Sequence, residues 1–175
     1  MDMDRATIRK PAVAGAFYPR EAGELVNTIA QLFSQAGKRT STGHPVAVIA
    51  PHAGYPYSGL TAAKAYKQIE GEQYDTVVVI SPSHTVFFKG SSVFPGKGYE
   101  TPLGLVETDR ELADKLANIN PSRIYYSNMG HATGSTRGEH ALEVQLPFLQ
   151  VMLGNFKLVA IVMGEIGRAS CRERV

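Results

Sequence analysis

Two stretches of the chain share one pattern, in which a short apolar run meets a proline and a histidine follows. The first is VAVIA at 46–50, before Pro51 and His52, and the second is TVVVI at 76–80, before SPSH and its His84. Short runs rich in β-branched residues are typical of buried strands, and proline ends a strand because it has no N–H to donate. The pattern therefore predicts two buried strands, each with a histidine just past its carboxyl end.

The segment between the two runs has the spacing of a helix. Over residues 59–69, Leu60, Ala63 and Tyr66 fall on one face. A strand, a helix and a second strand make the two strands parallel, and a right-handed crossover places both histidine loops at one edge of the sheet. Ligands bind at that edge in open α/β sheets, so two imidazoles there indicate a metal site.

The rest of the chain continues the alternation of helix and strand. We predict helices over 21–35, from 108 to Asn120 and over 139–153, strands over 123–127 and 157–163, and short β runs between 86 and 107. Thr108 to Glu111 fits a capping box, and Pro147 should kink its helix or mark a late start. This order predicts a single α/β domain.

Composition excludes several classes of protein. The 175 residues carry 18 basic against 16 acidic side chains without a basic stripe, so nucleic acid is not an expected partner. No apolar run is long enough to cross a bilayer, and MDMDRATIRK lacks the apolar core of a signal peptide. We therefore expect a soluble, cytoplasmic protein with no membrane partner.

The last eleven residues differ from the rest of the sequence. EIGRASCRERV at 165–175 resembles the translation of a short-read sequencing adapter, so we expect it to be read-through, with a polar terminal tail as the alternative. On that interpretation residues 1–164 form one domain that is incomplete at its C-terminus. Cys171, the only cysteine, lies in this tail, so residues 1–164 carry no disulfide or cysteine–metal signal.

A metal site at His52 and His84 needs at least one more ligand. Candidates in the chain are His140, Glu143 and His131, and a residue beyond the present chain is a further possibility. His140 and Glu143 lie three residues apart, which would put them on one helix face. The sequence contains no H-E-x-x-H, G-x-S-x-G, G-x-G-x-x-G or P-loop pattern, so those catalytic classes are not indicated.

Two tyrosines flank the first histidine loop. Tyr55 and Tyr57 follow His52 in the stretch HAGYPY. A tyrosine hydroxyl in a pocket can donate to a bound ligand or act as an acid or base, although both rings can equally be packed into the core. The expected pocket therefore consists of Tyr55, Tyr57, His140 and Glu143 around the two histidines.

Five blocks follow one another along the chain: RKPAVAGAFYP at 9–19, APHAGYPYSG at 50–59, SPSH at 81–84, YETPLG at 99–104 and HALEVQLPFL at 140–149. In this order they resemble the Memo-like family, whose prokaryotic members are called AmmeMemoRadiSam system protein B. Together they span essentially all of residues 8–164. The resemblance implies a fold similar to class III extradiol dioxygenases, a three-layer α/β sandwich around a mostly parallel sheet.

The resemblance also implies a metal centre. Class III extradiol dioxygenases hold non-haem Fe(II) with two histidines and a carboxylate, and the matching pocket of the Memo-like family uses the histidines that correspond to His52 and His84. In that family a cysteine near the C-terminus completes the metal set and an Asp-x-x-His pair lies nearby. Neither feature is present here, and Cys171 lies outside the family's motifs.

Several functions are compatible with this resemblance. Histidine ligands favour Fe(II) or Cu, with Zn possible, over Mg or Ca. One expectation is redox or dioxygenase-like chemistry, and the alternative is a non-catalytic module that binds a peptide or small ligand. The family also implies radical-SAM-system and AMMECR-like partner proteins. A third interpretation is that this chain is an inactive fragment; no catalytic residue is assigned and enzymatic activity stays open.

Overall fold

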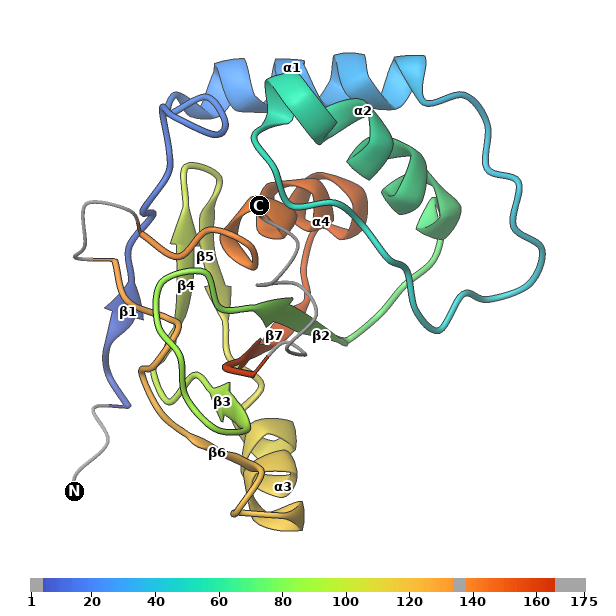
Figure 1. The fold of residues 1–175 in the computed structure, drawn as a ribbon. Helices are drawn as coiled ribbons and strands as arrows, with labels where there is room; N and C mark the ends of the chain where they lie inside the picture. Colours follow the sequence, from blue (N-terminus) through green and yellow to red (C-terminus); the bar gives the residue numbers. More distant parts are fainter. Residues whose placement is uncertain (1–4, 134–137, 166–175) are drawn as a thin grey trace, which may run out of the picture.

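The computed structural model describes residues 5–133 and 138–165 (Figure 1). The strands are β1 (Ile8–Arg9), β2 (Thr76–Pro82), β3 (Ser91–Val93), β4 (Gly98–Thr101), β5 (Gly104–Glu107), β6 (Ile124–Tyr126) and β7 (Lys157–Met163). The helices are α1 (Ala22–Gln35), α2 (Tyr55–Tyr66), α3 (Arg110–Ile119) and α4 (Leu146–Leu153), with short 3-10 turns η1 (Lys67–Ile69) and η2 (Glu143–Gln145). Apart from Glu165, the tail at 165–175, including Cys171, lies outside the described residues.

The strands form two small mixed sheets, which confirms the α/β class. One sheet has the order β2-β7-β3-β6 and the other has the order β1-β4-β5. β2 is parallel to β7, β3 to β6 and β1 to β4, whereas β3 runs antiparallel to β7 and β4 to β5. The larger sheet is mixed because β3, which follows β2 without a crossover helix between them, runs antiparallel to β7.

β7 lies inside the larger sheet and contributes side chains to a core on each face. Leu158, Ala160 and Val162 belong to the larger apolar cluster, which also contains residues of α1, α2 and α4. Val159 and Ile161 point the other way, into a smaller cluster that includes Ala113 of α3. This alternation follows from the two-residue period of a strand. It gives three layers, with α1, α2 and α4 on one side of the strands and α3 on the other (Figure 1).

The prediction of a buried strand over 46–50 is wrong for the described chain. This segment forms no strand, and Val46 and Ile49 are 96% and 97% exposed. A strand is defined by ladder hydrogen bonds to a neighbour, and no strand in the described ranges pairs with this segment. The strand predicted over 76–80 is confirmed as β2, and the one over 157–163 is confirmed as β7.

Helix positions agree with the sequence patterns better than helix starts do. α2 begins at Tyr55, four residues before the predicted start, because Pro56 fits the first turn of a helix, where no N–H partner is needed. Asp109 rather than Thr108 caps α3, and its carboxylate accepts the Leu112 N–H at 3.0 Å. α4 begins only at Leu146, with Pro147 in its first turn, which confirms the late start.

The helices are short compared with a bilayer. In the described ranges, no helix combines the length and apolarity that crossing a membrane requires.

Candidate metal centre

Three histidines from separate parts of the chain meet beside the carboxyl end of β2. His52 precedes α2, His84 follows β2 and His140 precedes η2. The ring centroids of His52 and His84 are 5.0 Å apart, those of His84 and His140 are 4.7 Å apart, and those of His52 and His140 are 6.1 Å apart. His52 and His84 therefore lie together even though residues 46–50 form no strand.

Backbone contacts hold the His52 loop in place. The Tyr55 N–H donates to the Phe17 carbonyl at 2.7 Å, and Gln145 Nε2 donates to the Pro51 carbonyl at 3.1 Å. At the end of β2, the Ser83 N–H continues the pairing with β7 by donating to the Met163 carbonyl at 2.9 Å. The His52 loop and the His84 loop are thus held by different parts of the chain, and both reach the same site.

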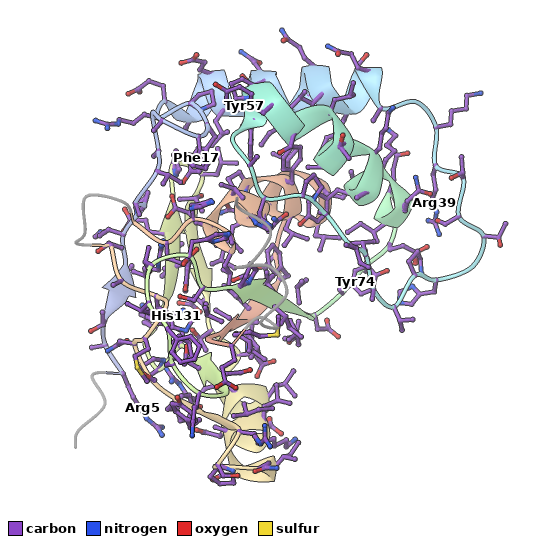
Figure 2. The ribbon with its side chains drawn as sticks, in the orientation of Figure 1. Arg5, Phe17, Arg39, Tyr57, Tyr74 and His131 are labelled. Carbon is purple, nitrogen blue, oxygen red and sulfur yellow. The ribbon has the colours of Figure 1, made fainter. Side chains whose placement is uncertain are left out.

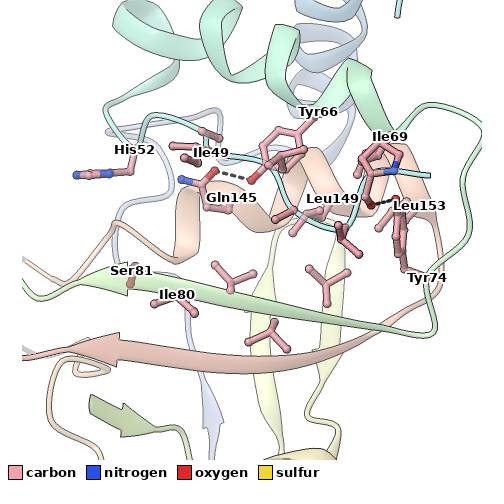
Figure 3. A pocket seen from close by; sticks show the side chains of 18 of the residues that line it. Ile49, His52, Tyr66, Ile69, Tyr74, Ile80, Ser81, Gln145, Leu149 and Leu153 are labelled. Atoms are coloured by element: carbon pink, nitrogen blue, oxygen red, sulfur yellow. Dashed lines mark hydrogen bonds between the residues drawn. The ribbon is translucent and has the colours of Figure 1, made fainter. Parts of the chain in front are cut away.

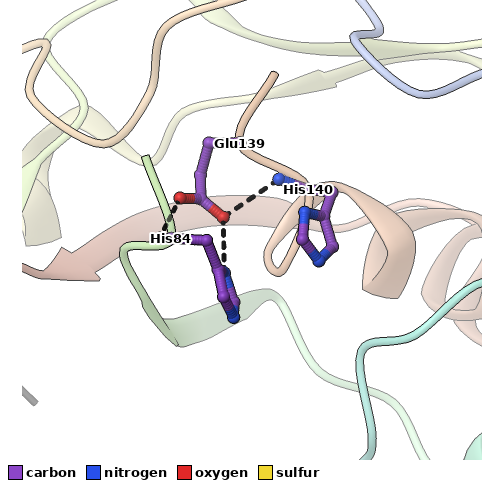
Figure 4. Close-up of side chains that lie close together, drawn as sticks. All are labelled: His84, Glu139 and His140. Atoms are coloured by element: carbon purple, nitrogen blue, oxygen red, sulfur yellow. Dashed lines mark hydrogen bonds and ion pairs between the residues drawn. The ribbon is translucent and has the colours of Figure 1, made fainter. Parts of the chain in front are cut away.

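Glu139 lies beside two of these histidines, His84 and His140 (Figure 4). Its carboxylate accepts the backbone N–H groups of His84, His140 and Ala141 at 2.5, 3.0 and 3.2 Å, and His84 Nδ1 lies 3.1 Å from Oε1. Burial acts to raise the pKa of Glu139, but these hydrogen bonds outweigh it and leave the pKa below its usual value. An ionised Glu139 keeps the proton of His84 on Nδ1, so Nε2 is free to bind a metal.

The other two histidines favour the neutral form that a metal needs. Burial, followed by the positive charge of His84 and then of His140 when they are protonated, lowers the pKa of His52. Burial and then His84 lower the pKa of His140 in the same way. Because metals bind neutral imidazole, these shifts leave His52 and His140 ready to act as ligands at neutral pH.

The separations suit a transition-metal ion. With metal–nitrogen bonds of about 2.0–2.1 Å and tetrahedral angles, the ring centres of three histidine ligands lie roughly 5 Å apart. One ligand atom from each of His84, Glu139 and His140 lies within 4.8 Å of the others, so these residues form a possible metal-binding group. Imidazole nitrogens favour Zn, Cu or Fe over Ca or Mg.

A cavity of about 570 Å³ opens over the three histidines. Its other lining residues are Ala16, Phe17, Pro51, Ala53, Gly54 and Tyr57. The Phe17 ring centre lies 4.6 Å from that of His140, and Tyr57 is 90% exposed on the same side of the molecule (Figure 2). The cavity therefore offers a metal-binding floor and aromatic walls, a combination typical of small-molecule sites.

The structure places only part of the expected pocket around these histidines. Tyr57 and His140 line the cavity, whereas Tyr55 and Glu143 are buried and do not line it. The Tyr55 hydroxyl donates to the Val144 carbonyl at 2.9 Å. The helical spacing of His140 and Glu143 does not apply because the chain forms η2 only from Glu143 onward.

Glu143 already has a full set of donors. Its carboxylate accepts from Arg9 Nη1 at 2.6 Å, from the Ala12 and Val13 N–H groups at 2.8 and 3.0 Å, and from the Tyr18 hydroxyl at 2.6 Å. A carboxylate has about four acceptor positions, so none is left for a metal. His131, the other candidate ligand, is buried between Ser92 and Tyr99 and does not line the cavity.

Sequence reasoning missed Glu139. The residue directly precedes His140, but an adjacent pair in a loop has no spacing that predicts a shared site. Its role depends on the approach of the His84 backbone, which is 55 residues away in sequence.

Comparison with known proteins gives a consistent match. The model of the family described as "Memo-like protein" matches residues 9–173. A MEMO1 family protein of Thermoplasma volcanium is 38% identical over 90% of this chain and 56% of its own length. MEMO1 family proteins of Aquifex aeolicus and Ignicoccus hospitalis are each 41% identical over 89% of this chain, and over 55% and 56% of their own lengths. The chain thus spans about half the length of the curated relatives it matches.

Proposed function

The chain belongs to the Memo-like family, and on that premise we propose that it binds one transition-metal ion through His52, His84 and His140 for redox chemistry on a small molecule. The observation that supports this most directly is the convergence of three imidazoles above a buried carboxylate, at the floor of an accessible cavity. We propose iron or copper as the ion, with zinc as the non-redox alternative.

Each residue of the site has a distinct task in this proposal. The three histidines hold the ion, and Glu139 keeps the proton of His84 on Nδ1. Phe17 contacts the apolar part of a bound molecule, while the Tyr57 hydroxyl at the cavity mouth donates a hydrogen bond to it. The ion, when bound, supplies Lewis-acid or one-electron chemistry at a coordination position that the protein leaves open.

Metal titration of single-histidine variants tests the proposal. We expect wild-type protein to bind one ion of Fe(II), Cu(II) or Zn(II) per chain in calorimetry and in metal analysis after dialysis. His52→Ala, His84→Ala and His140→Ala should each weaken binding by more than the roughly 10–100-fold typical of losing an outer partner. His44→Ala is the matched control, because that exposed histidine bonds Glu72 and lies outside the cavity. Unchanged binding in all three variants would overturn the site.

Oxygen consumption then separates the two expected functions. A loaded protein that consumes oxygen with a reducing organic substrate supports redox chemistry. A protein that binds metal in a full stoichiometric amount but shows no turnover across a panel of reducing substrates supports the non-catalytic binding module instead.

Glu139 provides a second, finer prediction. Glu139→Gln should weaken metal binding by about 10–100-fold while the protein stays folded, because an uncharged amide holds the Nδ1 proton of His84 more weakly and its NH2 group cannot accept a backbone N–H. Calorimetry measures the affinity, and circular dichroism verifies the fold. Glu111→Gln serves as the control, since that exposed side chain pairs with Lys115 and does not line the cavity. Equal affinities of Glu139→Gln and wild type would show that Glu139 does not orient the ligand.

A further inference from the structure

A second cavity lies between the segment 45–50 and strand β2 (Figure 3). Its volume is about 520 Å³ in a long groove, and its floor includes Tyr66, Ile69, Leu149 and Leu153. The two walls are apolar, since one is PVAVIA at 45–50 and the other is TVVVISP of β2. A groove of this shape and composition suits an extended apolar segment of polypeptide.

The groove is fixed at both ends. Gln145 Nε2 donates to the Pro51 carbonyl at one end. At the other end, the Tyr74 hydroxyl donates to the Pro45 carbonyl at 2.6 Å (Figure 3). Between these two contacts the segment pairs with no strand of the described chain. The distance between this segment and β2 is therefore set by the side-chain hydrogen bonds at its two ends and not by pairing between the segment and the strand.

Both walls have unused capacity to pair. β2 pairs with β7 along its whole length, and its other edge has no partner among the described strands. Val48 and Ala50 on one wall and Val77 and Val79 on the other pack against the core, while their neighbours point outward. Because the alternation of the two walls matches, a strand placed between them could pair with both.

A buried hydroxyl points to the same conclusion. Ser81 is 3% exposed and lines the groove, and its Oγ has no hydrogen-bond partner among the residues described. Buried polar atoms are nearly always paired, so an orphan beside a cavity indicates that something polar belongs there. A backbone carbonyl of an added strand would accept this hydrogen bond.

We propose that the groove takes one β-strand, which lies between residues 46–50 and β2 and comes from the part of a Memo-like chain that has no counterpart here. Each strand of the described chain already has a place in a sheet, so the added strand must come from outside this set. The match leaves more than two fifths of the Thermoplasma volcanium relative uncovered. That part of the relative is long enough to supply the strand.

An added strand would account for two unfavourable features of this surface, its exposed isoleucines and the unpaired edge of β2. It would cover Ile49 and Ile80, which are 97% and 60% exposed, and give the β2 edge its hydrogen bonds. His52 lines both the groove and the metal cavity, so a strand in the groove would also steady one proposed ligand. The inference itself does not depend on metal binding.

Hydrogen exchange with a peptide series tests the proposal on the chain as it exists. Overlapping synthetic peptides that cover the unmatched part of the Thermoplasma volcanium relative are added one at a time to the 175-residue protein. We expect one apolar peptide, or two that overlap, to slow exchange at residues 46–50 and 77–81 by at least about tenfold. Ser81→Ala should weaken the binding of that peptide by about two- to tenfold, because one hydrogen bond is lost.

Charged substitutions provide the matched pair of variants. Ile80→Lys places a charge at the groove and should weaken peptide binding by at least about tenfold. Val26→Lys, on the exposed side of α1, should leave peptide binding unchanged. If none of the peptides slows exchange at these residues, the proposal is overturned. Protection of the same amides that grows with protein concentration alone, together with a dimer in sedimentation, would assign the groove to a second copy of this chain and also overturn it.

Discussion

Replacing Glu143 by glutamine is expected to lower the free energy of unfolding by about 3–5 kcal/mol. The Arg9 and Glu143 side chains are 3% and 0% exposed, and Nη1 lies 2.6 Å from Oε2. Removing one charge of a buried pair leaves the other without compensation, and the desolvation of Arg9 then opposes folding. Glutamine also puts N–H groups against donors that need an acceptor.

Urea unfolding followed by circular dichroism measures this loss. The control is Lys115→Met, which breaks an exposed pair of the same length with Glu111, at 2.6 Å and four residues apart in α3. We expect that variant to change stability by less than about 0.5 kcal/mol, since water and salt screen exposed pairs. A Glu143→Gln variant as stable as the control would show that Arg9 finds another partner or hydration in the folded state.

The same ion pair connects the core to the proposed metal centre. Arg9 Nε donates to the His131 carbonyl at 2.9 Å and Nη2 donates to the Glu139 carbonyl at 2.5 Å. Glu143 in turn holds the N-terminal segment at Ala12 and Val13. Glu143 therefore helps to position the residues around the proposed metal centre without lining its cavity.

The sequence predicted correctly those strands that are fully buried and have a neighbouring strand in the described chain. β7 was predictable because all five of its central residues are apolar, as an interior strand requires. The run at 46–50 has the same composition but forms no strand, since an apolar pattern reports what a segment prefers and not whether a neighbour is present. Its exposed valine and isoleucine are among the observations that support the proposed added strand.

The candidate site was predictable in its histidines and not in its carboxylates. His52 and His84 each follow an apolar run and a proline, and that shared context is visible in the sequence. Glu139 and Glu143 are both acidic residues near His140, and nothing local distinguishes them. The fold does so, because Glu143 meets Arg9 and Tyr18 while Glu139 meets the His84 loop.

Acidification is expected to destabilise the protein through His131. This histidine lies in the interior among the strands (Figure 2), where it is 2% exposed. Burial, offset in part by the Ser92 carbonyl and assisted by Arg9, lowers the pKa of His131 to about 3. Its contacts fit the neutral ring: the Tyr99 hydroxyl faces Nδ1, and Nε2 lies 2.9 Å from Ser92 Oγ, which itself donates to the Met129 carbonyl.

The sign follows from the proton balance between the two states. An unfolded histidine takes up its proton near pH 6.5, whereas folded His131 stays neutral until about pH 3, so the unfolded state binds more protons in between. Stability is therefore full above pH 6.5 and falls as the pH drops toward 3. Between pH 7 and pH 4.5 this one group should remove about 2.5 kcal/mol.

Unfolding curves of wild type and His131→Gln at several pH values isolate this contribution. Glutamine can occupy the same place between Ser92 and Tyr99 but does not titrate, so the variant should start less stable and lose about 2.5 kcal/mol less on acidification. All other titrating groups are shared by the two proteins and cancel in the comparison. Parallel pH profiles would mean that His131 is protonated in the fold, with the Tyr99 hydroxyl turned to accept from Nδ1.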